Sequence, residues 1–196
     1  MKTVIVFHSV TGNGFLLARQ FRDELERLGV TASLFRVADP LWKEKPDLPF
    51  AAQDNLRGMM ALPEATPQVL VDAELIIMGS PTYFGNVSAP MKAFLDSTGG
   101  LWVKGSLAGK RFAAFTSAGN AEGGGDLCLQ ALHTYAKYMG MLAVPLPVTV
   151  VPGVNTPASG VIQYSAGKYA EVLDPGTARI ISGFASFLRG CYGTAH

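Results

Sequence analysis

Three short segments rich in glycine, hydroxyl and amide groups hold the residue types that could carry chemistry. The first offers two hydroxyls and three unhindered backbone amides, on Ser9, Thr11, Gly12, Asn13 and Gly14. A helical pattern follows it directly, and the N-terminus of a helix favours a negative charge. The segment therefore predicts a phosphate cradle without a lysine, although an ordinary capping turn has a similar composition.

The second segment sets two aromatic rings between a proline and a glycine. Its residues are Pro81, Thr82, Tyr83, Phe84, Gly85 and Asn86. Backbone polar groups beside flat apolar rings suit a planar ligand with a hydrogen-bonding edge, such as the isoalloxazine ring of a flavin. A proline-stabilised turn with core aromatics is the alternative.

The third segment is again rich in glycine, so its backbone can approach the other edge of the same planar ligand. Its candidate residues are Ser117, Ala118, Gly119, Asn120, Ala121, Gly123 and Gly124. A mobile turn is the alternative. His8 ends the strand before the first segment and is interpreted as structural. It forms no triad or metal cluster with His133 and His196, and we predict no metal site.

Hydrophobic patterns place each segment directly after a strand. Strands are expected at 3–7, 31–37, 74–79, 111–117 and 141–148, and helices at 17–28, 88–97, 126–139 and 174–188. Strands that alternate with helices predict a doubly wound α/β fold, a five-stranded parallel sheet in the order 2-1-3-4-5 with helices on both faces. Ligands bind outside the carboxyl ends of such strands, where the three segments fall.

Length and composition favour one compact domain over residues 1–196. The chain has 196 residues, of which 48% are hydrophobic, enough for a sizeable core. Segment 39–63 contains four prolines and is expected to be an irregular insertion with a short helix around 54–61. A formal charge of +1 with scattered Lys and Arg disfavours nucleic-acid binding. No apolar run suits a signal or membrane segment, so the protein is expected to be cytoplasmic.

The run between residues 65 and 102 resembles the NAD(P)H:quinone oxidoreductases of the tryptophan-repressor-binding-protein type, which have a flavodoxin-like fold. The similar stretches are Ala65-Thr66-Pro67-Gln68, Ser80 to Asn86, and Phe94-Leu95-Asp96-Ser97-Thr98-Gly99-Gly100-Leu101-Trp102. A weaker similarity continues through Gly123-Gly124-Gly125 and Gly140-Met141 to Val144-Pro145. The resemblance covers roughly the first three quarters of the chain.

This resemblance implies a flavin mononucleotide (FMN) with its phosphate on 9–14, its ring against 81–86 and its other edge along 117–124. Trp102 would border the substrate side of the flavin. The implied reaction moves a hydride from NAD(P)H to FMN and then two electrons to a quinone or similar flat acceptor, with no catalytic side-chain acid or base. The family also implies a homodimer or homotetramer.

Three departures from the family pattern lie near the implied substrate pocket. Thr11 replaces a common tyrosine, Tyr138-Met139 replaces paired histidines, and the tail 153–174 lacks a glycine-rich loop. Three other functions therefore stay open. They are a flavodoxin-type electron carrier, which the near-neutral charge argues against, an FMN reductase with a non-quinone acceptor, and a protein that binds another phosphate-bearing ligand.

Overall fold

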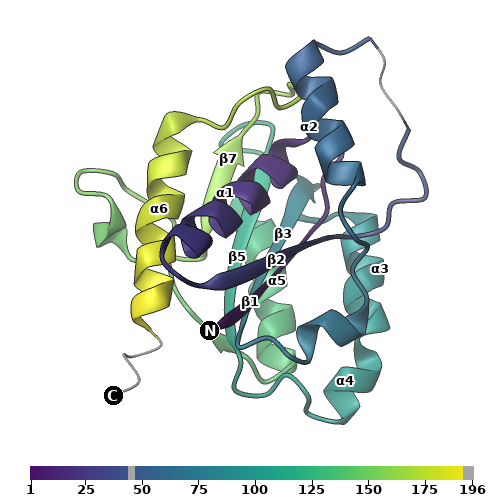
Figure 1. Ribbon diagram of the computed structural model, residues 1–196, viewed down its shortest axis with the longest axis vertical. Coiled ribbons are helices and arrows are strands. Elements are labelled where there is room, and N and C mark those ends of the chain that lie inside the picture. Colours follow the sequence, from purple (N-terminus) through teal and green to yellow (C-terminus); the bar gives the residue numbers. More distant parts are fainter. Residues whose placement is uncertain (44–46, 192–196) are drawn as a thin grey trace.

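The computed structural model describes residues 1–43 and 47–191 (Figure 1). Its strands are β1 (Lys2–Phe7), β2 (Thr31–Arg36), β3 (Leu75–Tyr83), β4 (Asn86–Val87), β5 (Arg111–Ala118), β6 (Leu142–Ala143) and β7 (Val161–Tyr164). Its α-helices are α1 (Asn13–Arg27), α2 (Phe50–Met60), α3 (Ala89–Ser97), α4 (Gly99–Val103), α5 (Gly125–Tyr138) and α6 (Pro175–Gly190). Two short 3-10 helices are η1 (Pro67–Leu70) and η2 (Val148–Val150).

The central sheet runs in the order β2-β1-β3-β5, and each neighbouring pair in this run is parallel. Both β6 and β7 also pair in parallel with β5, on its far side from β3. They share the fifth position in the sheet. The predicted order of the doubly wound sheet, 2-1-3-4-5, is thus confirmed.

The fifth strand differs from the one expected at 141–148. Within that segment β6 alone pairs with β5, at Arg111 and Phe112. Pro145 and Pro147 follow closely and lack the N–H that a central ladder requires, so the chain leaves the sheet there. It returns at β7, which pairs with residues 115–118 of β5. The carboxyl half of the fifth position therefore comes from a segment for which the sequence had predicted no strand.

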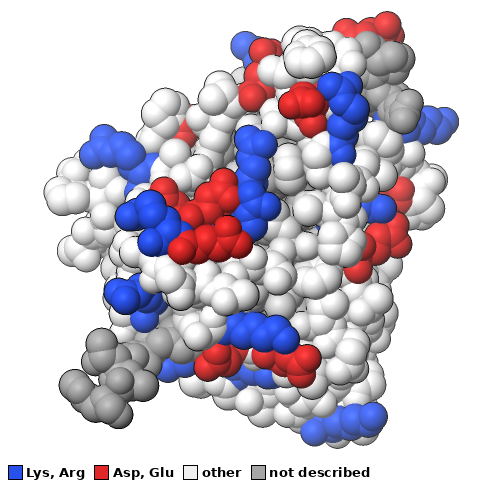
Figure 2. Space-filling view, in the orientation of Figure 1, with Lys and Arg blue, Asp and Glu red and all other residues white. Residues whose placement is uncertain are grey.

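Helices cover both faces of the sheet, as expected. On one face α1 and α6 pack over the core that contains Ile5 and Phe7, and on the other α3 and α5 cover Val4 and Val6 (Figure 1). Alternate residues of β1 thus point to opposite cores, as in a strand buried on both faces. On the α1 face acidic and basic side chains lie side by side (Figure 2). Arg27 and Glu24 of α1 form an ion pair at 2.8 Å.

The described part of segment 39–63 contains one helix, α2, which is longer than the helix predicted around 54–61. The ring of Phe15 on α1 would lie 3.5 Å from a Cβ added at Gly58, so the two helices pack closely. Residues 44–46 of this segment lie outside the described residues. Within the described chain, each helix is too short or too polar to cross a bilayer.

Candidate functional site

The three predicted segments meet at one edge of the sheet, because β1, β3 and β5 are parallel and end together. Phe7 pairs with Gly79, and Pro81 pairs with Ser117. The backbone N–H of His8 donates to the carbonyl of Gly79 at 2.9 Å. The carboxyl edge of the sheet thus brings the first, second and third segments into one region, as the sequence predicted.

The first segment forms the N-terminus of α1 with free backbone amides. The helix N-cap is Gly12, in the left-handed conformation at φ 86°, and no side chain in the described part of the chain caps it. A Cβ at Gly14 would lie 2.8 Å from the carbonyl oxygen of His8, so only glycine fits this turn. An uncapped N-terminus with no acidic residue in its first turn is suited to an anion.

A segment of the tail that the sequence analysis did not include in the site lies over the first segment. The side-chain amide of Asn13 donates to the carbonyl of Lys168 at 2.9 Å, and the N–H of Ala170 donates to the carbonyl of Thr11 at 2.9 Å. Asn55 of α2 donates to the carbonyl of Ala170 at 3.0 Å. The backbone of Lys168 therefore lies against the first segment, which contains no lysine of its own.

The second segment is a tight hairpin rather than an irregular loop. β3 extends through Tyr83 and pairs antiparallel with β4, so that Tyr83 faces Asn86. Phe84 and Gly85 at its tip both have positive φ, 51° and 72°. Positive φ is strained for an aromatic residue, and the side chain of Phe84 is fully exposed. Phe84 is therefore not one of the core aromatic residues that the alternative interpretation of this segment expected.

The threonine of this hairpin ties it to the neighbouring strand. The hydroxyl of Thr82 lies 2.9 Å from that of Thr116, which in turn donates to the carbonyl of Ser80 at 2.7 Å. Tyr83 is half-exposed. Partial burial raises the pKa of its phenol, and the nearby Asp39 and Tyr169 raise it further. Tyr83 is therefore uncharged at neutral pH.

The third segment packs directly against the hairpin. Ser117 and Ala118 belong to β5, and the segment then turns through a bond from the N–H of Gly123 to the carbonyl of Asn120 at 3.2 Å. A Cβ at Gly124 would lie 2.9 Å from the Cα of Gly85. The second and third segments thus touch through two glycines, which fixes their separation.

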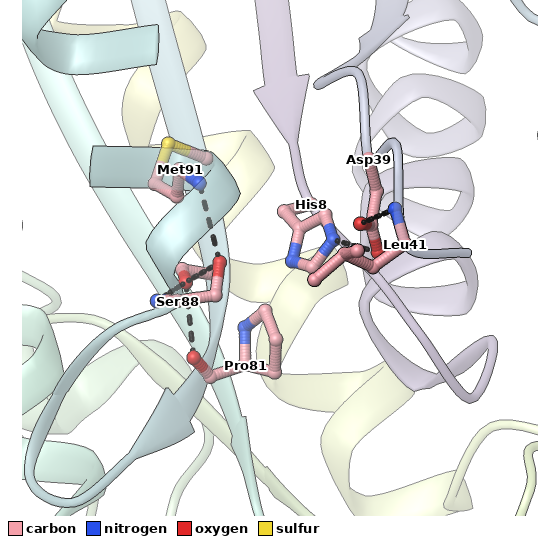
Figure 3. Close-up of polar contacts among 7 residues, drawn as sticks. His8, Asp39, Leu41, Pro81, Ser88 and Met91 are labelled. Carbon is pink, nitrogen blue, oxygen red and sulfur yellow. Dashed lines mark hydrogen bonds and ion pairs between the residues drawn. The ribbon is translucent and has the colours of Figure 1, made fainter. Parts of the chain in front are cut away.

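A buried histidine, His8, immediately precedes the first segment in the chain and lies next to the partly buried Asp39 (Figure 3). The Nε2 atom of His8 is 3.2 Å from a carboxylate oxygen of Asp39, whose other oxygen accepts from the N–H of Leu41 at 3.0 Å. Burial lowers the pKa of His8, and Asp39 opposes this shift only in part. The neutral ring therefore donates from Nε2. Its Nδ1 has no hydrogen-bond partner among the described residues.

The stability of the protein is expected to fall as the pH is lowered below the usual histidine pKa of 6.5. The unfolded chain then binds a proton at His8 that the folded protein excludes, so unfolding takes up protons and the free energy of unfolding rises with pH. One such proton contributes at most about 1.4 kcal/mol per pH unit. His8→Gln keeps an amide donor for Asp39 and should show a shallower slope in urea unfolding between pH 5 and 6.5. Equal slopes would contradict this prediction.

Trp102 lies far in space from the three segments of its own chain. α3 begins at the carboxyl edge of the sheet and runs back, so α4, which carries Trp102, lies at the opposite end of the molecule (Figure 1). The indole is 57% exposed. The sequence placed Trp102 beside a substrate, and within one copy of the chain the fold does not bring it to the three segments.

The described residues contain no group of three or more His, Cys, Asp or Glu side chains that could hold a metal ion. They do enclose a cavity of about 720 Å³ beside the hairpin, which the sequence did not reveal. Asp39 at its edge was also missed, because a single aspartate in a proline-rich segment gives no motif.

Comparison with known proteins agrees with this geometry. Residues 1–156 match the family of NADPH-dependent FMN reductases. A protein named NAD(P)H dehydrogenase (quinone) from Deinococcus radiodurans is 39% identical over 145 residues, which are 74% of this chain and 72% of that protein. One of the same name from Geobacter sulfurreducens is 37% identical over 150 residues, which are 75% and 72% of the two chains.

Solved structures show the same fold at lower identity. The flavodoxin, WrbA-like protein from Agrobacterium tumefaciens aligns over 97% of this chain and 96% of its own, with a TM-score of 0.65 and 20% identity. Flavodoxin 1 from Bacillus cereus aligns over 96% of this chain and 98% of its own, with a TM-score of 0.63 and 15% identity. The fold is therefore flavodoxin-like, and since the family match spans residues 1–156, the chain belongs to the family of NADPH-dependent FMN reductases.

Proposed function

We propose that this protein is an FMN-dependent oxidoreductase that takes electrons from NAD(P)H and reduces a quinone, of the tryptophan-repressor-binding-protein type. The family match and the names of the relatives from Deinococcus and Geobacter support this function. The observation that carries it is the uncapped, glycine-bearing N-terminus of α1, which lies where three segments meet at the carboxyl edge of the sheet.

The residues present fit FMN. No side chain in the described part of the chain caps the first amides of α1, and the tightness of the turn at Gly14 keeps side chains out of it. Gly12, Asn13 and Gly14 are buried, with Ala170 of the tail against Gly12. The proposed phosphate ligands are Ser9, Thr11, Gly12, Asn13 and Gly14. The hairpin 81–86 would cover the ring, and residues 117–121 with Gly123 and Gly124 would line its other edge. Backbone groups of these segments provide the donors and acceptors that the pyrimidine edge of a flavin needs.

When bound, FMN supplies the two-electron transfer between NAD(P)H and the acceptor. The protein's own residues bind and orient. The hydroxyl contact between Thr82 and Thr116 ties the hairpin to the neighbouring strand β5. The Gly85–Gly124 contact sets the spacing of the two segments that would flank the ring. No side chain of the three segments is assigned a proton-transfer role.

Trp102 can border a substrate only if a second copy of the chain supplies it, because it lies at the opposite end of its own molecule (Figure 1). We therefore assign its role to a homodimer or homotetramer. Its exposed indole offers a stacking surface for a flat acceptor.

Trp102→Ala is expected to lower kcat/KM for a flat quinone by about five-fold, because loss of an aromatic contact weakens binding by roughly 1 kcal/mol. The affinity for FMN should not change. Steady-state kinetics and sedimentation of the FMN-loaded protein test this, with Leu142→Ala, also at an exposed apolar residue, as control. If Trp102→Ala had the kinetics of the wild type, or if the monomer were fully active, Trp102 would not be part of the substrate site.

The experiment for the function itself combines binding and turnover. FMN is titrated into flavin-free protein and followed by quenching of flavin fluorescence, and NADPH oxidation is then measured with and without benzoquinone. Saturable binding and quinone-dependent oxidation of NADPH are expected. Failure of FMN to bind would refute the proposal.

A further inference from the structure

A cavity of about 720 Å³ lies between the hairpin, the start of α3 and the first segment, which it meets at His8 and Val10. Its walls come from the end of β1, the segment after β2, the hairpin and the start of α3. The lining is mainly apolar and includes the rings of Trp42, Tyr83 and Phe84. A cavity of this size and character is typical of a site for a small planar molecule.

One polar group at the inner wall lacks a partner. His8 lines the cavity, and only 2% of its surface is exposed. Its Nδ1 atom has no hydrogen bond within the described chain. Because Nε2 donates to Asp39, Nδ1 of the neutral ring carries a lone pair and can only accept. Figure 3 shows this nitrogen on the side of the ring that faces Pro81 and Ser88, and away from Asp39.

This unpaired nitrogen favours a ligand with an N–H or O–H group. A buried acceptor without a donor is destabilising, and a ligand donor would remove that penalty. Because His8 lines the cavity, a ligand donor inside the cavity would approach this ring.

The charges around the cavity favour an anion. Lys43 and Lys92 both line it. Lys92 pairs with Asp96 at 2.6 Å, but that pair is exposed and therefore weak, so its ammonium group can turn to a ligand. Asp39 is the acidic residue in the lining, and both of its oxygens already accept hydrogen bonds. The cavity thus combines aromatic walls, an acceptor at its inner end and two cations.

We infer that this cavity binds the adenosine-phosphate end of NADPH, with the adenine between the aromatic walls and its phosphates towards Lys43 and Lys92. Adenine carries an exocyclic amine that can donate to Nδ1 of His8. The hairpin that would cover the flavin is also a wall of the cavity, so the cavity borders the proposed flavin site. This inference rests on the proposed function, because it assigns a place to the electron donor of that reaction.

Calorimetric titration with adenosine 2′,5′-bisphosphate tests the site without any turnover. Ala89 lines the cavity, is exposed and begins α3, so Ala89→Phe should fill the cavity and weaken binding at least ten-fold. Ala93→Phe, at an exposed alanine of the same helix outside the cavity, is the matched control and should bind normally. The ¹⁵N signals of the His8 ring should shift on binding in the wild-type protein.

A second variant, which changes only a charge, keeps the inference testable if Ala89→Phe disturbs folding. Lys92→Gln should weaken the bisphosphate about three-fold and reduce the salt dependence of binding, because one exposed cation is lost. Lys137→Gln, on an exposed lysine of α5, is its control. Equal affinity in the wild type, Ala89→Phe and Lys92→Gln would overturn the inference. Binding of naphthoquinone that Ala89→Phe abolishes, with no binding of the bisphosphate, would also overturn it.

These outcomes separate the inference from the proposed function. FMN binding and benzoquinone reduction are measured on the same samples. Normal turnover of wild type and both variants at low NADPH, with unaltered bisphosphate binding, would refute the cavity site alone. Loss of FMN binding in the wild type would refute the proposed function, while bisphosphate binding that depends on Ala89 and Lys92 would still support the cavity as an adenosine-phosphate site.

Discussion

A Thr11→Glu variant is expected to bind FMN at least ~100-fold more weakly than the wild-type chain. Thr11 is partly exposed within the first segment, and its hydroxyl accepts from the side chain of Asn13 at 3.0 Å. A carboxylate there would face the phosphate that the free amides of α1 are proposed to bind. Two like charges near 4 Å repel by about 4 kcal/mol at the effective dielectric of a protein surface, and solvent screening leaves a part of this.

Fluorescence titration of flavin-free protein with FMN measures the effect. Thr134→Glu adds the same charge on an exposed face of α5 and should bind FMN normally. The urea unfolding of Thr11→Glu should resemble that of the flavin-free wild type, because the residue contributes little to the core. If Thr11→Glu bound FMN as tightly as Thr134→Glu does, the first segment would not be the phosphate site.

Gly124→Ala is expected to lower the free energy of unfolding by about 2–5 kcal/mol and to weaken FMN binding. At φ 76° an alanine is strained by about 1–2 kcal/mol. Its Cβ would also lie 2.9 Å from the Cα of Gly85, and overpacking of this kind typically costs 1–3 kcal/mol. Backbone rather than a flexible side chain stands in the way, so the hairpin and the third segment must move apart.

Gly105→Ala isolates the part of this effect that comes from backbone conformation. Gly105 has φ 62°, and a Cβ there would meet no atom within 4 Å. This control should lose only about 1–2 kcal/mol and should bind FMN normally. If the two variants were equally stable in urea unfolding and bound FMN equally, the Gly85–Gly124 contact would have no part in the site.

Most of the fold could be predicted from local hydrophobic and capping patterns in the sequence. β1 is continuously apolar because it is buried on both faces, and α6 begins where Asp174 and Pro175 predict, with Asp174 accepting from the N–H of Thr177 at 2.8 Å. The three segments were found because glycine, hydroxyl and aromatic residues follow buried strands. Parallel topology then places them at one edge of the sheet.

The features that the sequence did not predict depend on contacts between distant residues. β7 takes its place by pairing with β5, and its short, mixed sequence gives no strong strand pattern. The position of Lys168 over the first segment depends on a hydrogen bond to Asn13, 155 residues away in the chain. Trp102 was associated with the site by resemblance, whereas its position at the far end of α3 depends on the helix running back along the sheet.

The most direct test of the proposed function is an anaerobic spectral titration of the FMN-loaded protein, first with NADPH and then with benzoquinone. The visible absorbance of oxidised flavin should disappear with about one equivalent of NADPH and return with about one equivalent of quinone, because each transfer moves two electrons. A bound flavin that NADPH leaves oxidised, or whose reduced form benzoquinone does not reoxidise, would contradict the proposed function.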